Sequence, residues 1–169
     1  MLLALLLFLF QAGGPVVTTT PASDPLAQLT ILDGEWTVTS PHTMAGPGKT
    51  DSLVNHCHLT DAYYTCEQVV NGKSMALIVF TATETAGSYH TQIVLPNGYS
   101  TGRADLKIDG SHWTYLGKST SDDGKTTTWY RTENVFTGRD RIHFEQYESN
   151  DNTSWKKTNE GDETRSSKG

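Results

Sequence analysis

The chain has 169 residues, a formal net charge of −6 at neutral pH and a mean hydropathy of −0.46. This length suits one domain with one hydrophobic core, since domains commonly span about 100 to 200 residues. The acidic charge argues against nucleic acid and anionic membranes as partners, because both bind clustered Lys and Arg.

Residues 1–14 have the composition of a secretory signal peptide. The apolar run MLLALLLFLF is followed by small residues, which is the arrangement of a signal-peptide core and its cleavage zone. An uncleaved anchor is the alternative, but a helix needs about 17 to 25 apolar residues to span a bilayer. We therefore expect export to the periplasm or the exterior, without stable insertion in a membrane.

The segments that flank the expected domain lack hydrophobic periodicity. Residues 15–25 are rich in Thr and Pro, which is typical of a flexible leader. The end of the chain is almost entirely polar and charged, so we expect residues 166–169 to be a disordered tail. Residues 26–165 are then the folded domain.

The pattern after the leader predicts an all-β protein with one short helix. The helix is expected within Asp24 to Leu32, with Asp24 as its N-cap and Pro25 at its first position. From Trp36 onward, short runs rich in Val, Ile, Thr, Tyr and Trp alternate with Gly, Asn and Asp turns. This pattern predicts an antiparallel up-and-down meander.

Turn dipeptides set the expected strand pairings. Asn71-Gly72, Asn97-Gly98 and Asp109-Gly110 favour tight hairpins, which fix the register of both strands. Carried through the last two turns, the register sets His90 opposite Asp105. It also predicts one apolar face that contains Ile93, Leu95, Ala104, Leu106, Trp113 and Tyr115.

Cys57 and Cys66 are expected to form a disulfide. A hairpin that turns at Asp61-Ala62 sets the two cysteines directly opposite each other, at a Cα separation that a disulfide can bridge. Export favours the bond, and two buried free thiols are the alternative. With Cys57 inside, His56 and His58 point to solvent; they form a solvated face in preference to a metal site.

The hairpin Thr127 to Glu148 supplies the candidate ligand-binding residues. If Asp122-Asp123-Gly124 is a three-residue loop with a glycine bulge, one face of this hairpin points inward, whereas a two-residue loop reverses the assignment. Buried charge is costly unless it is paired or contacts a ligand. The predicted site therefore combines Arg131, Glu133 and Gln146 with Trp113, Tyr115, Trp129 and Phe144, and an internal salt bridge between Arg131 and Glu133 is the structural alternative.

The segment Leu32-Asp33-Gly34-Glu35-Trp36 resembles the Gly-X-Trp signature that opens lipocalins and other calycin barrels. The resemblance implies a barrel of about eight to ten strands with an internal ligand cavity. It implies structural roles for Gly34 and for Trp36, which would close one barrel end against a basic residue that the sequence does not identify. The chain looks like the uncharacterised exported lipocalin-like domains of bacteria, and it is more distantly similar to haem-binding nitrobindin barrels.

These observations favour a binding protein that holds a small, partly apolar ligand inside a β-barrel. The sequence indicates no catalytic residue, no metal site and no cofactor, because it contains no nucleophile elbow and no phosphate-binding loop. Two alternatives stay open. One is a small-molecule enzyme of barrel type that uses haem at a histidine. The other is a protein-interaction module with a filled barrel and an outer face of Tyr130, His143, Glu145 and Tyr147.

Overall fold

The structure is a computed structural model that describes residues 24–166. The predicted signal peptide (1–14) lies outside these residues, as do most of the predicted leader (15–25) and tail (166–169). Within the described range, no helix has the length and apolar character needed to cross a membrane. The predicted processing and the domain limits remain predictions.

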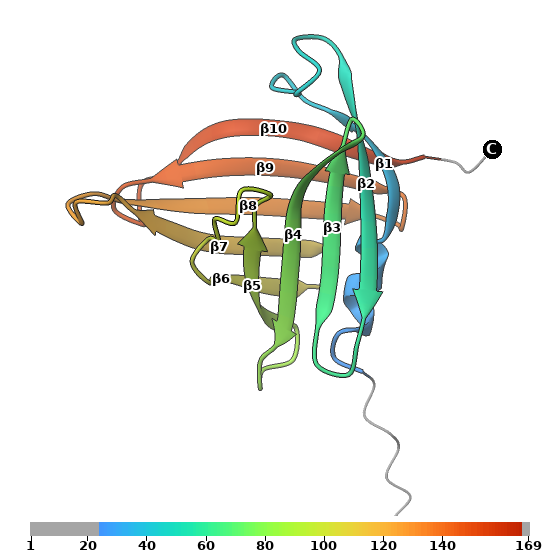
Figure 1. Ribbon diagram of the computed structural model, residues 1–169, viewed down its shortest axis with the longest axis horizontal. Coiled ribbons are helices and arrows are strands. Elements are labelled where there is room, and N and C mark those ends of the chain that lie inside the picture. Colours follow the sequence, from blue (N-terminus) through green and yellow to red (C-terminus); the bar gives the residue numbers. More distant parts are fainter. Residues whose placement is uncertain (1–23, 167–169) are drawn as a thin grey trace, which may run out of the picture.

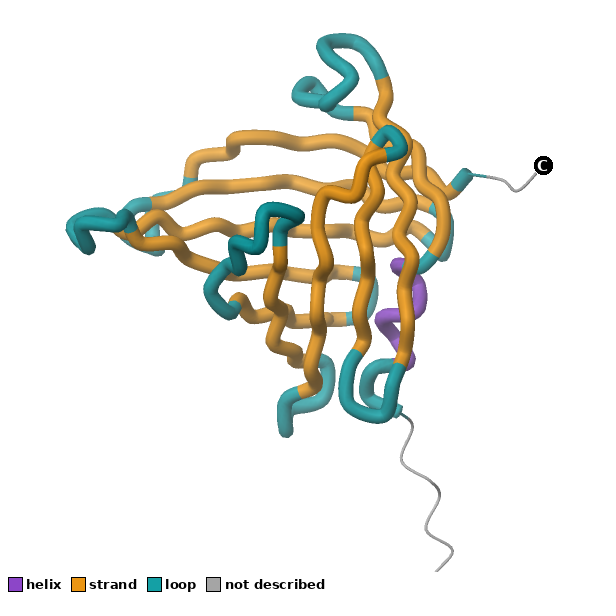
Figure 2. The backbone as a smooth tube through the Cα atoms, viewed as in Figure 1, coloured by secondary structure: helices purple, strands orange, loops and turns teal. Residues whose placement is uncertain are grey.

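Ten strands and one short helix make up the described chain (Figures 1 and 2). Each strand pairs antiparallel with its neighbours in sequence, and β1 pairs with β10, so the sheet closes into a barrel. The predicted all-β antiparallel meander is therefore confirmed. The elements are η1 (Ala27–Leu32), β1 (Gly34–Thr39), β2 (Thr50–Leu59), β3 (Tyr64–Val70), β4 (Lys73–Ala82), β5 (Ser88–Val94), β6 (Ala104–Asp109), β7 (His112–Thr120), β8 (Thr127–Thr137), β9 (Arg141–Ser149) and β10 (Lys156–Arg165).

The barrel is flattened into two layers whose strands cross steeply. In Figure 1, β2 to β5 run vertically in front and β6 to β10 run horizontally behind them. The loops β1–β2, β3–β4, β5–β6, β7–β8 and β9–β10 lie at one end of the strands, which we call the open end. The remaining turns and η1 lie at the other end, which we call the closed end.

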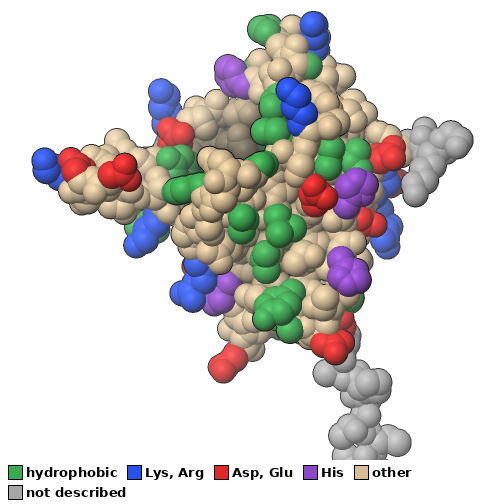
Figure 3. All heavy atoms as spheres, in the orientation of Figure 1, with side chains coloured by type: hydrophobic (Ala, Val, Ile, Leu, Met, Phe, Trp, Pro, Cys, Tyr) green, Lys and Arg blue, Asp and Glu red, His purple; other side chains and the backbone are tan. Residues whose placement is uncertain are grey.

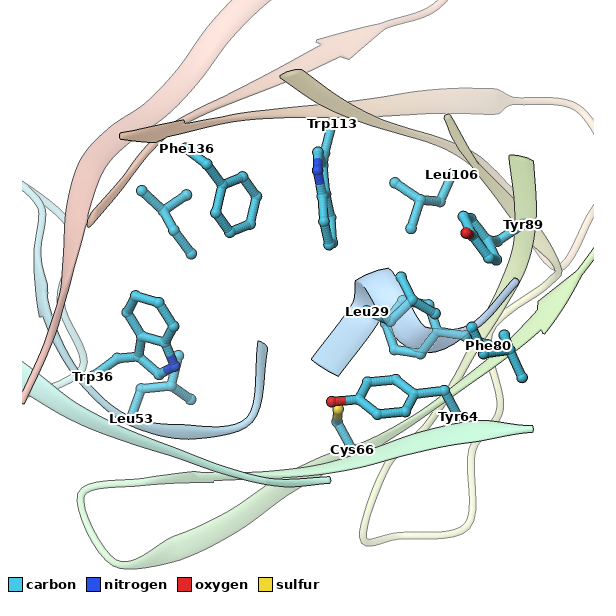
Figure 4. Packing of buried hydrophobic residues seen from close by; sticks show 12 residues of the cluster. Leu29, Trp36, Leu53, Tyr64, Cys66, Phe80, Tyr89, Leu106, Trp113 and Phe136 are labelled. Carbon is cyan, nitrogen blue, oxygen red and sulfur yellow. The ribbon is translucent and has the colours of Figure 1, made fainter. Parts of the chain in front are cut away.

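An apolar core fills the closed end (Figure 4). Leu26 and Leu29, at the start of and within η1, are buried among aromatic and aliphatic side chains from the strands. The helix is a 3₁₀ helix that begins later than predicted, and Asp24 accepts a hydrogen bond from the Leu26 amide at 2.9 Å. The strand residues in this core are Trp36, Leu53, Tyr64, Cys66, Phe80, Tyr89, Leu106, Trp113, Phe136 and Ile142.

Trp36 closes this end together with a residue from the last strand. The Arg165 guanidinium lies 4.2 Å from the centre of the Trp36 ring and donates hydrogen bonds to the carbonyls of Asp33 and Ile31 at 2.6 and 2.7 Å. Gly34 has a φ of +118°, and a Cβ there would lie 2.7 Å from Arg165 Nη1. The basic partner that the Gly-X-Trp resemblance implies is therefore present as Arg165.

The predicted disulfide is confirmed. Cys57 and Cys66 are directly paired across β2 and β3, with their Cα atoms 4.1 Å apart. The predicted Asn71-Gly72 turn also forms, with positive φ at both residues, which is the geometry of a type I′ hairpin. His56, His58 and Glu67 point outward and are exposed, as the register predicts.

For the β6–β7 hairpin, the predicted register is wrong, but the predicted inward face is correct. The turn consists of Gly110 and Ser111, so Leu106 pairs with Tyr115 and Ile108 with Trp113. The sequence predicted that Trp113 lies beside Leu106. Because the shift is two residues, Trp113 and Tyr115 still point inward, as predicted.

Candidate functional site

Three adjoining cavities occupy the open half of the barrel. The inner chamber, of about 240 Å³, lies next to the apolar core. The polar lobe, of about 260 Å³, opens beside the β1–β2 loop, where Figure 3 shows the surface hollowed. The large lobe, of about 590 Å³, opens below the β5–β6 and β7–β8 loops. Thr132 lines all three, so they meet at its side chain.

A row of polar side chains crosses β7 to β10 at the level of Thr132. Tyr115 pairs with Thr132, Thr132 with Gln146, and Gln146 with Asn159. Paired residues of antiparallel strands point to the same face, so all four side chains point into the barrel. The apolar core below this row is therefore capped by polar groups.

Hydrogen bonds orient part of this row. The Ser40 hydroxyl donates to Asn159 Oδ1 at 2.7 Å, and Asn159 Nδ2 donates to Gln146 Oε1 at 3.2 Å. These two bonds leave the Gln146 amino group directed to the cavity, without a partner among the described residues. Gln146 thus offers a hydrogen-bond donor to a molecule in the polar lobe.

Two buried amide oxygens have no hydrogen-bond partner within the described chain, Asn55 Oδ1 and Asn134 Oδ1. Asn55 Nδ2 donates to the Leu32 carbonyl at 3.1 Å, so the orientation of this amide, beside the inner chamber, is fixed. Both residues line that chamber. A buried polar atom without a partner costs about 1–3 kcal/mol, which a bound hydrogen-bond donor would recover.

Glu163 is the main acidic group of the cavity. It faces inward between Val38 and Ile142, its apolar neighbours on β1 and β9, and it lines both the inner chamber and the polar lobe. No ion pair or hydrogen bond within residues 24–166 reaches its carboxyl group. Burial raises the pKa of Glu163 to about 7, because an enclosed carboxylate loses its hydration without gaining a partner.

Two inward-facing tyrosines have neutral hydroxyl groups: Tyr115 lines the inner chamber and the large lobe, and Tyr64 lies in the apolar core. Burial raises the pKa of Tyr115 and the negative charge of Glu163 raises it further, which places the two groups within one electrostatic environment. Burial and the charge of Asp33 raise the pKa of Tyr64, whose hydroxyl is also without a partner in the described chain. Both phenols stay protonated at neutral pH.

A second carboxylate, Asp51, lies at the rim of the polar lobe and is fully engaged. It accepts hydrogen bonds from the backbone amides of Met44 and Ala45 at 2.7 and 2.8 Å and from Asn71 Nδ2 at 2.7 Å. Burial opposes its charged form, but these bonds outweigh burial and lower the pKa of Asp51. Asp51 therefore holds the β1–β2 loop against the β3–β4 turn.

The predicted inward orientation of Trp129, Arg131 and Glu133 is wrong. Arg131 lies on the outer face, with its guanidinium 4.5 Å from the centre of the Tyr147 ring and 4.6 Å from that of Trp155. Its Nε lies 3.0 Å from Glu133. On the same face, the Trp129 ring lies under the ammonium group of Lys118.

Loop lengths at both ends of β8 account for this error. Thr120 pairs with Thr127 across a six-residue loop. A loop with an even number of residues orients β8 as the two-residue alternative would, and not as the expected three-residue loop would. At the other end, Thr137 pairs with Arg141, so three residues form a turn that was expected to contain four. A one-residue shift exchanges the faces, so Thr132, Asn134 and Phe136 point inward instead.

The other predicted site residues point into the barrel but do not all reach the cavity. Tyr115, Gln146 and Phe144 line it, whereas Trp113 packs in the apolar core against Phe136 at 4.6 Å between ring centres. Asn55, Asn134 and Glu163 were missed. For Glu163, the sequence offered one signal. The resemblance implies a basic partner for Trp36, and that partner, Arg165, shares the inner face of β10 with Glu163.

The outer-surface candidates are already engaged. His143, Glu145 and Glu160 form a cluster with metal-ligand chemistry. However, the Lys157 ammonium contacts Glu145 and lies 2.8 Å from Glu160, so both carboxylates are already paired with one cation. Of the six histidines, which all lie in the described range, His42 lines the polar lobe and the other five line none of the three cavities. The haem alternative therefore rests on one exposed loop residue.

These features define a class of protein: a closed ten-stranded antiparallel barrel, apolar at one end and with a polar cavity at the other. No family model matches the chain, and no curated protein matches it. The fold is similar to the crystal structure of Rv2717c from M. tuberculosis, with a TM-score of 0.54 and 12% sequence identity. The similarity covers 84% of this chain and 97% of that chain. At this identity the likeness shows the fold alone.

Proposed function

We propose that the protein is an exported binding protein that holds a small, partly apolar ligand in the open half of a lipocalin-like barrel. The observation that carries the proposal is the unfilled space of the open half with the Glu163 carboxyl, unpartnered in the described chain, on its wall. Two further oxygens without a partner among the described residues, Asn55 Oδ1 and Asn134 Oδ1, are buried within residues that line the same chamber. A barrel that serves as a solid scaffold gains stability when apolar side chains fill it. Polar atoms beside open space are the arrangement of a ligand site.

The apolar character of the ligand follows from the large lobe. Its inner wall includes Ile93, Ala104, Tyr115 and Tyr130, and contact with such surfaces removes apolar ligand area from water. The polar lobe and the inner chamber supply hydrogen-bonding groups at the other end of the space. A ligand with one polar end and one apolar end matches this division.

Two observations support export. The apolar first residues are typical of a signal peptide, and the Cys57–Cys66 disulfide is a bond that persists in oxidising compartments. Tyr130 was predicted to lie on an outer face that could bind a protein partner, but it lines the large lobe instead. The cavity also argues against the filled barrel that this alternative assumes.

The test is whether the cavity takes up an uncharged apolar probe. N-phenyl-1-naphthylamine should gain fluorescence with the wild-type protein. Thr132→Phe, which places a large ring where the three cavities meet, should weaken probe binding at least tenfold. Ala104→Phe, on the wall of the large lobe, should have a similar effect.

Thr164→Phe is the matched control, since Thr164 pairs with Arg141 on the outer face and is exposed. It should bind the probe as the wild type does. Near-ultraviolet circular dichroism must show that each variant is folded. Equal probe binding by the wild type and by both cavity variants would refute the proposed site.

A further inference from the structure

The charges on the walls of the inner chamber and the polar lobe have one sign. The inner chamber and the polar lobe are lined by two carboxyl groups, Glu163 and Asp51, and by no Lys or Arg among the described residues. His42 is the remaining titratable nitrogen at the edge of the polar lobe. A ligand group in this space meets a negative potential. The Arg165 cation, on the same face of β10 as Glu163, is held on Trp36 and on the carbonyls of Asp33 and Ile31 and does not line either space.

The two carboxylates differ in what they can offer. Asp51 already accepts hydrogen bonds from Met44, Ala45 and Asn71, so its charge is compensated. Glu163 has no partner within residues 24–166, although it borders the open space. An incoming cation would therefore pair with Glu163.

Two amide oxygens at the inner chamber lack a hydrogen-bond donor within residues 24–166. Asn55 Oδ1 and Asn134 Oδ1 are both acceptors without a donor in the described chain, and the Asn55 amide is held in this orientation by Leu32. The Glu163 carboxyl on the wall of this chamber matches a group with several N–H donors. A carboxylate or phosphate group on the ligand would meet the like charge of Glu163, with the Gln146 amino group as a hydrogen-bond donor.

We propose that the ligand carries a protonated nitrogen, an ammonium or amidinium group, that binds Glu163 in the inner chamber. Its apolar body extends past Thr132 into the large lobe, between Tyr115 and Tyr130. This inference rests on the proposed function and specifies the ligand class for the same site. The basic residues that line the large lobe, Arg103 and Lys118, lie at its rim, and the Lys118 ammonium stacks outside on Trp129.

The acidity of Glu163 adds a dependence on pH. An ammonium binds the ionised carboxylate, so its affinity rises as pH rises through the pKa of Glu163, about 7. Between pH 6 and pH 8 the ionised fraction, and with it the affinity, increases about tenfold. Tyr115 stays neutral and Asp51 stays ionised over this range. His42 is the other group that faces the lobe, and His42→Gln controls for it.

The test compares three probes of equal chain length: octylamine, 1-octanol and octanoate, titrated calorimetrically into the full chain at pH 8. Octylamine should bind at least tenfold more tightly than either of the others. Glu163→Gln should remove the preference for the amine, so that octylamine and 1-octanol bind this variant with similar affinity. Octylamine affinity should fall about tenfold at pH 6 in the wild type and in His42→Gln, but not in Glu163→Gln.

The outcomes separate the two proposals. If 1-octanol or octanoate binds as well as octylamine, the amine class is wrong and the binding function stands. If none of the three binds and the uncharged probe also fails, the proposed function is wrong. If Glu163→Gln does not fold, an NMR titration of the Glu163 carboxyl carbon in the wild type tests the inference instead. Saturating octylamine must lower its apparent pKa, and an unchanged titration would overturn the inference.

Discussion

At the scale of single residues, Glu163 points into the barrel because β10 pairs with β1 when the barrel closes. Its strand, Lys156–Arg165, contains no aliphatic or aromatic residue beyond the stems of its charged side chains, so nothing in its own segment marks an inner face. The face is set by β1, where Val38 and Trp36 pair with Glu163 and Arg165. A carboxyl group placed among apolar neighbours in this way keeps its proton to higher pH.

The stability of the fold should respond to this carboxyl group. The folded pKa of about 7 lies above the ordinary glutamate pKa of 4.5, so ionisation opposes folding increasingly as pH rises from 4.5 to 7, by up to about 3 kcal/mol. Glu163→Gln should therefore match the wild type at pH 4.5 and exceed it at pH 8. Urea unfolding of both proteins at the two pH values measures the difference. A difference that does not change with pH would contradict the assigned environment.

Gly34 should be less replaceable than Gly98, although both have positive φ. Gly34→Ala adds a Cβ at a φ of +118° and 2.7 Å from Arg165 Nη1, whereas Gly98→Ala adds one at +84° into open space. Gly98→Ala should cost about 1 kcal/mol for backbone strain, and Gly34→Ala should cost about 1–2 kcal/mol more because it displaces Arg165 from Trp36. Thermal unfolding of both variants, together with Trp fluorescence, measures this; equal losses would argue against the packing of Arg165.

At the scale of elements, the β1–β2 loop depends on one buried side chain. Asp51→Asn turns an acceptor of three hydrogen bonds into a group that must present one N–H to donors, and this should cost about 1–3 kcal/mol. The amides of Met44 and Ala45 should then exchange with deuterium much faster. The amide of Gly98, in the separate β5–β6 loop, is the control. Unchanged exchange at Met44 and Ala45 would show that Asp51 does not hold the loop.

The hairpins also show how far the sequence could predict the structure. The Asn71-Gly72 turn and the pairing of Cys57 with Cys66 followed from local rules, because positive φ and directly opposed cysteines restrict the register. The orientation of β8 did not follow from local rules. The loop between Thr120 and Thr127 contains several turn residues, and the number of residues in the loop determines which face of β8 points inward. The stacking of Arg131 on Tyr147 and Trp155 then stabilises the charge outside.

At the scale of the whole molecule, the barrel has two halves with different roles. The disulfide, η1 and the large aromatic side chains concentrate at the closed end, which can carry most of the stability. The open end is lined by Thr, Asn, Gln and Glu side chains beside unfilled space. The fold class was predictable from alternating strands and turns. The cavities were not, because all ten strands contribute residues to their walls and come together only when β10 closes the barrel.

A crystal structure of the full chain grown with octylamine at pH 8 tests the central claim most directly. The account predicts the amine nitrogen within hydrogen-bonding distance of the Glu163 carboxyl, near Asn55 and Asn134, with the alkyl chain passing Thr132 into the large lobe. An amine bound only outside the barrel, or side chains that fill the space beside Glu163, would contradict it.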